Sequence, residues 1–94
     1  MKAEFHGKVG VSKFPGYLVI EDEAIHTRTI LDRWTGRTSI HRGQGATLRL
    51  RERPLSCSLT YLLPGMVFDQ ELFTTAPCNL APALAASGWE FLRV

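Results

Sequence analysis

Short runs of alternating apolar and polar residues, separated by Gly, Pro or acidic turns, make up most of this chain. Alternation with a period of two is typical of half-buried β-strands, so the pattern predicts several short, mostly antiparallel strands. In the clearest run, Leu48 and Leu50 share one face and are expected to lie in the core. The opposite face of the same strand carries Thr47, Arg49, Arg51 and Arg53.

Pro64-Gly65 is expected to form a turn between two further strands, over residues 55–63 and 66–73. The dipeptide suits a type II turn, in which proline fits the second position and glycine the third. Asp69 and Glu71 face away from the apolar residues of the second strand. They would be ion-pair partners for the arginines if the strands are adjacent.

The period changes near the C-terminus and predicts one short helix, which begins after the N-cap residue Asn79 and ends at Gly88. An apolar tail over residues 89–94 is expected to form a final strand or an extended segment. The expected fold is α+β: a small antiparallel, partly open β-barrel or strongly bent sheet of about six to seven strands, with one short C-terminal helix. Residues 1–94 are expected to form a single domain.

This order of elements resembles that of the bacterial pleckstrin-homology-like domains, in which a C-terminal helix plugs one end of a partly open β-barrel. The segments that carry the resemblance are residues 16–20, 25–28, 38–40 and 72–75, with Leu80, Leu84 and Gly88-Trp89 after them. Such domains bind phosphoinositides through a Lys-x-Lys/Arg loop motif, which has no counterpart in this chain. The resemblance therefore implies the fold and no binding residue.

Composition narrows the class of protein. Apolar residues make up 45% of the chain and the net charge is only +2, which argues against disorder. No apolar run approaches the roughly 20 residues of a membrane span, and the first residues lack the apolar stretch of a signal peptide. A cytoplasmic location without a membrane span is therefore expected. Cys57 and Cys78 are expected to be buried free thiols, although one disulfide is geometrically open to them.

Few residues indicate catalytic or metal chemistry. His6, His26 and His41 form no closely spaced ligand pair, and the acidic residues 21–23 are expected to be a solvated turn. Neither a phosphate-binding loop nor a nucleophile motif is present. The sequence predicts a non-enzymatic protein with no catalytic residue, metal or cofactor. A pocket that holds His26 or His41 beside a carboxylate would instead indicate an enzyme.

The middle of the chain is basic, because residues 26–53 carry seven arginines against two acids. One hypothesis is an interaction module that binds a protein partner or forms a homodimer. Its apolar anchors would be Leu62, Met66 and Phe68, with the three arginines of the alternating strand as its charged side. The alternative is binding of single-stranded nucleic acid, with Trp34 stacked on a base and Arg49, Arg51 and Arg53 on phosphates. A purely structural role would pair the arginines with nearby acids.

Overall fold

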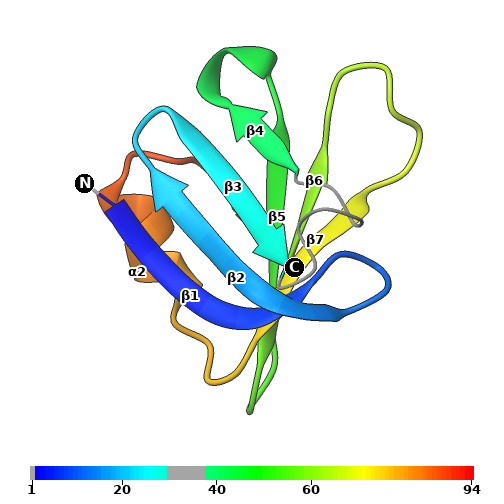
Figure 1. Ribbon diagram of the computed structural model, residues 1–94. Helices are drawn as coiled ribbons and strands as arrows, with labels where there is room; N and C mark the ends of the chain where they lie inside the picture. The colour runs from blue at the N-terminus through cyan, green and yellow to red at the C-terminus, as the bar shows by residue number, and fades with distance from the viewer. Residues whose placement is uncertain (1, 30–37) are drawn as a thin grey trace.

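The computed structural model describes residues 2–29 and 38–94 of the chain. Within these residues, eight strands form one sheet in the order β4-β3-β2-β1-β7-β6-β5-β8 (Figure 1). Neighbouring strands are antiparallel, except that β8 runs parallel to β5. The strands are β1 (Lys2–Val9), β2 (Phe14–Glu21), β3 (Ala24–Thr29), β4 (Ser39–His41), β5 (Thr47–Glu52), β6 (Cys57–Leu62), β7 (Gln70–Thr75) and β8 (Leu92–Arg93).

The mostly-β architecture with one short helix near the C-terminus is confirmed, but the expected six to seven strands are too few. The described residues form eight, and the last of them, β8, comes from the tail after the helix, as expected, and lies beside β5. In the described part of the chain, no strand pairing joins the edge strands β4 and β8, so the sheet is not closed.

Two glycines allow the first hairpin to approach its neighbours closely. Gly7 of β1 and Gly16 of β2 are directly opposite each other. A Cβ atom on Gly7 would lie 2.7 Å from the Phe73 ring and would also meet the backbone oxygen of Thr74. Glycine at this position therefore lets Phe73 of β7 pack directly onto the β1 backbone.

The core lies on the inner face of the sheet, where the inward positions of β2 to β7 meet the helix. Leu48 and Leu50 of β5 are fully buried there, as the alternation predicts. Helix α2 (Leu80–Ala86) lies at one end of the sheet, near the start of β1 (Figure 1), and buries Leu80 and Leu84. The helix ends where expected, because Gly88 has the positive φ of 76° that glycine adopts most easily.

Trp89 and Arg42 fix the end of the helix to the β2–β3 turn. The indole N–H of Trp89 donates to the Glu21 carbonyl at 2.7 Å, and the Arg42 guanidinium lies 4.5 Å from the centre of the Trp89 ring. Arg42 opens a short 3-10 helix, η1 (Arg42–Gln44). Its guanidinium donates to the backbone carbonyls of Asp22, Ser87 and Gly88.

A disulfide joins Cys57 of β6 to Cys78, which precedes α2. The expectation of free thiols is therefore wrong. The reason lies in the register: Cys57 is directly opposite Thr75, the last residue of β7, and the chain turns back over β6 three residues later. Because this pairing depends on strand order, the spacing of the two cysteines alone does not indicate it.

Candidate functional site

The arginine-bearing face of β5 forms the floor of a polar surface over three strands. The register places Arg49 opposite Thr60 and Arg51 opposite Ser58 on β6, and Ser58 opposite Thr74 on β7. Arginines on one strand therefore face a row of hydroxyl groups on the next two. We call this surface the cationic groove; it comprises Lys13, Arg49, Arg51, Arg53, Ser58, Thr60, Asp69, Glu71 and Thr74.

Two ion pairs cross the cationic groove. Arg49 donates to the carboxylate of Asp69 at 2.9 Å, although the two residues are not on adjacent strands: β6 lies between β5 and β7, and Asp69 reaches Arg49 from the loop before β7. The other acid, Glu71, pairs instead with Lys13 from the β1–β2 turn at 2.9 Å. Four cationic side chains against two carboxylates leave an excess of two positive charges. Among the described residues, Arg51 and Arg53 have no carboxylate within ion-pair distance.

The surroundings of the Glu71 carboxyl group lower its pKa. The hydrogen bond from the Lys13 ammonium lowers the pKa of Glu71, partial burial opposes this, and the hydrogen bond from the Thr74 hydroxyl adds to the lowering. Glu71 is thus a charged, tethered group, and it holds Lys13 at the border of the groove.

The cationic groove is hollowed in two places. One hollow, of about 270 Å³, lies over the arginine ladder and reaches Asp69 and Val94. The second, of about 310 Å³, extends toward Lys13 and Ser56. Both are lined by Arg53 and Ser58, so the two hollows are adjacent. Their size and polarity suit an extended polar segment lying across the strands.

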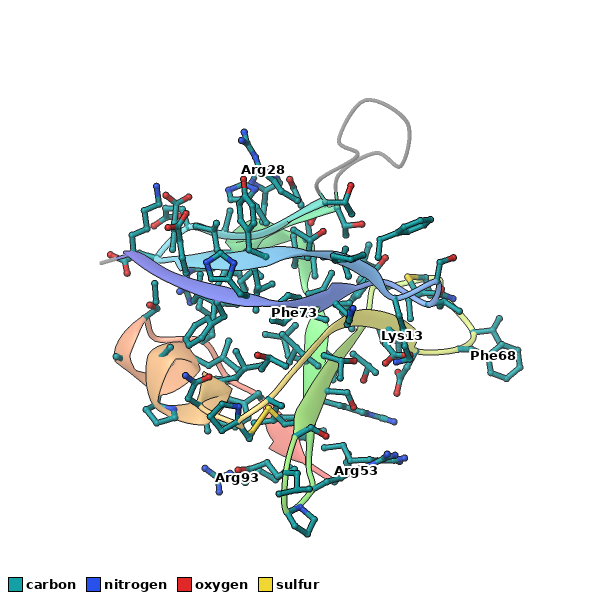
Figure 2. All side chains as sticks on the ribbon, turned by 60° about the horizontal axis from the view of Figure 1, so that its bottom comes forward. Lys13, Arg28, Arg53, Phe68, Phe73 and Arg93 are labelled. Atoms are coloured by element: carbon teal, nitrogen blue, oxygen red, sulfur yellow. A yellow bond between two sulfur atoms is a disulfide. The ribbon has the colours of Figure 1, made fainter. Side chains whose placement is uncertain are left out.

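Next to the groove, the β6–β7 loop over residues 63–69 exposes a pair of large apolar side chains. Val67 is 81% exposed and Phe68 is 76% exposed. Figure 2 shows Phe68 pointing away from the body of the molecule, on the same side as Lys13. We call Val67 and Phe68 the apolar tip. The following residue, Asp69, is held by Arg49, so the apolar tip begins directly at the border of the groove.

The three predicted anchors have different environments. Phe68 is exposed, whereas Leu62 and Met66 are only half-exposed. Met66 folds back onto the turn, where its Sδ accepts a hydrogen bond from the Leu63 N–H. Val67 is not among the predicted anchors, because residues 66–73 were expected to form one strand, whereas residues 66–69 lie in the loop before β7. Lys13 was not predicted either, because its position depends on the β1–β7 pairing.

The proposed nucleic-acid face is only partly described. Arg49, Arg51 and Arg53 do share one face of β5. Trp34, the residue expected to stack on a base, lies outside the described residues.

A second cluster of polar side chains lies on the outer face of the other half of the sheet. His26 of β3 contacts Ser39 of β4 and Glu21 of β2. From the sequence, His26 was expected to be a surface histidine and Glu21 part of a solvated acidic turn. Only the register brings the three together. In the described part of the chain, no group of three or more His, Cys, Asp or Glu side chains could hold a metal ion.

Every helix found within residues 2–29 and 38–94 is too short or too polar to cross a membrane. Comparison with protein-family models, with curated proteins and with solved structures finds no match to this chain.

Proposed function

We propose that this domain is an interaction module, and that it binds an acidic segment of a protein partner across the cationic groove and the apolar tip. The observation that carries the proposal is the exposure of Val67 and Phe68 beside a surface with an excess of two positive charges. In this reading the groove and the tip act by binding, without catalysis.

The apolar tip supplies the affinity in this proposal. Small folded proteins seldom place two large apolar side chains in succession at the end of a loop unless the pair is buried by something else. An aromatic side chain that enters a pocket of a partner is a frequent centre of binding energy. Phe68 has the exposure and position for that role, and Val67 adds to the apolar area.

The cationic groove supplies the specificity. Arg51 and Arg53 are exposed and can each bind a carboxylate of the partner through two parallel hydrogen bonds. The hydroxyls of Ser58 and Thr60 add further polar contacts. A symmetric homodimer through this surface would bring two positively charged grooves together, which disfavours self-association. The apolar tip favours a protein over a nucleic acid, because the aliphatic side chain of Val67 offers neither a ring to stack on a base nor a charge for a phosphate.

Our proposal for the architecture is a partly open barrel of the pleckstrin-homology-like type. Its support is the order of the elements: antiparallel strands followed by one short helix at an end of the sheet.

The test uses fluorescent peptides of defined charge. One peptide alternates Glu with Leu and Phe, and a matched peptide carries Lys in place of Glu; a single-stranded DNA oligonucleotide is the third probe. Fluorescence anisotropy at low and high salt measures the dissociation constants. We expect the acidic peptide to bind best and to weaken as salt rises. Phe68→Asp is expected to weaken binding by at least about 30-fold, the effect of losing a central apolar contact.

The control for this experiment is Leu55→Asp, because Leu55 is 83% exposed but lies on the β5–β6 turn. It should bind like the parent protein. Circular dichroism should show that Phe68→Asp stays folded, since the side chain is exposed. Unchanged peptide binding in Phe68→Asp would contradict the proposal. Tighter binding of the DNA would favour the nucleic-acid alternative, and a dimer in light scattering that Phe68→Asp dissociates would favour self-association.

A further inference from the structure

Three polar side chains lie in contact on the outer face of β2, β3 and β4. The register places His26 directly opposite Ser39, and Nδ1 of His26 lies 2.9 Å from the Ser39 hydroxyl oxygen. Nε2 of the same ring lies 3.2 Å from Oε2 of Glu21, the last residue of β2. One imidazole therefore bridges a serine hydroxyl and a carboxylate.

The carboxylate determines which ring nitrogen carries the proton in the neutral imidazole. An ionised carboxylate attracts an N–H group, so Glu21 favours the tautomer with the proton on Nε2, the nitrogen nearest to it. Nδ1 then keeps its lone pair and accepts the hydrogen of the Ser39 hydroxyl. The hydroxyl is thus directed at a base, and Glu21 is placed to stabilise the imidazolium that forms when the base takes the proton.

The three side chains line a hollow of about 430 Å³, a size typical of sites for small molecules. Lys2, Tyr17 and Arg28 line the same hollow. Figure 2 shows Arg28 projecting from this face of the sheet. The two cationic groups and the phenol hydroxyl are hydrogen-bond donors that can stabilise negative charge on a carbonyl oxygen in the hollow.

We propose that Ser39 is a modification site: a nucleophilic serine that accepts an acyl group from an activated ester such as a thioester. The bond between Ser39 Oγ and the acyl carbon forms, and the bond between that carbon and the thiol sulfur breaks. Nδ1 of His26 takes the hydroxyl proton and passes it to the departing thiolate. The products are an acyl-serine ester and a free thiol, with no change in oxidation state.

This site is separate from the cationic groove, because none of the residues that line its hollow lines either hollow of the groove. Glu21 acts through His26 as a positioning residue, whereas Ser39 and His26 contact the reacting atoms.

The first test measures covalent labelling of Ser39. The folded full chain is treated with a fluorophosphonate, which reacts with activated serines, and the adduct is located by intact-mass and peptide mass spectrometry. We expect one adduct per chain, at Ser39, and none in Ser39→Ala. Ser58→Ala, a matched strand serine in the cationic groove, should label like the parent protein. Labelling that persists in Ser39→Ala, or an absence of labelling in the parent, would overturn the proposal.

The second test identifies the base. His26→Ala is expected to slow labelling by at least about 100-fold, the usual contribution of a general base. Imidazole added to the solution should restore part of that rate, an effect that a merely structural role of His26 would not produce. With p-nitrophenyl acetate, the parent should gain one acetyl group at Ser39. Acetyl transfer of equal rate in Ser39→Ala would show direct action of the imidazole and would overturn the role of the serine.

Discussion

At the scale of single residues, the ion pair between Lys13 and Glu71 makes the stability of the fold depend on pH. Because the pKa of Glu71 is lower in the folded protein than its usual value of 4.5, the pair stabilises the fold above that value. The contribution is lost as the pH falls through the lowered pKa of the folded state. Both side chains are partly exposed, so solvent screens the interaction.

Lys13→Met should therefore decrease the free energy of unfolding near pH 7 by about 0.5 kcal/mol. The difference from the parent protein should vanish in acid, where Glu71 is protonated in both proteins. Urea unfolding across a pH series measures this, with Lys2→Met at the far end of β1 as the control. A difference that is constant with pH would contradict the expectation.

Gly7 is a second important residue, because local packing depends on the absence of a Cβ atom there. Gly7→Ala places a methyl group 2.7 Å from the Phe73 ring, so strand β1 or the ring must shift. We expect a loss of roughly 1–3 kcal/mol in the free energy of unfolding, the range for overpacked cores. Gly43→Ala is the matched control, because no atom lies within 4 Å of the new methyl group. Equal unfolding midpoints for the two variants in urea would be inconsistent with this packing.

Residue-level alternation was the most reliable signal in the sequence. It predicted the burial of Leu48 and Leu50, which depends only on a strict period of two within one strand. The ion pair of Arg49 with Asp69 does form, but not between adjacent strands as expected, because Asp69 lies in the loop before β7 and β6 separates β7 from β5. The contacts of Arg42 with backbone carbonyls were not predictable, because they join residues far apart in the sequence.

At the scale of elements, the segment after β6 shows how a turn can be predicted and its strands misplaced. The N–H of Met66 donates to the carbonyl of Leu63, and Gly65 has a φ of 92°, as the predicted type II turn requires. However, β6 ends at Leu62 and β7 begins only at Gln70. The apolar residues between them have the sequence pattern of a strand, although Val67 and Phe68 are exposed. Hydrophobicity alone cannot separate a buried strand from an exposed apolar loop.

The disulfide is the second element-level feature, because it holds the segment before α2 against β6. Replacing Cys57 with Ala and Cys78 with Ser opens a loop of 21 residues in the unfolded chain. The expected loss is about 3 kcal/mol in the free energy of unfolding. Urea unfolding with and without a reductant measures it: the reductant should destabilise the parent protein and leave the double variant unchanged. Two alkylatable thiols in the unreduced parent would contradict the pairing.

At the scale of the whole molecule, the sequence predicted the class of fold and not the order of strands. Local hairpins such as β1–β2 and β2–β3 follow from short turns between adjacent strands. The pairing of β1 with β7 does not, since no turn connects them and only Lys8 and Val9 take part. This pairing also positions Lys13 beside Glu71. The cationic groove therefore depends on strand pairing that hydrophobic periodicity does not specify.

The central position of β1 has a consequence for synthesis of the chain on the ribosome. β1 can pair with β2 soon after both emerge, but its other edge stays unpaired until residues 73 and 74 of β7 have been translated. Contacts between such distant segments form slowly, because a long loop must close first. For most of translation the nascent chain therefore exposes an open strand edge, on which another chain could add.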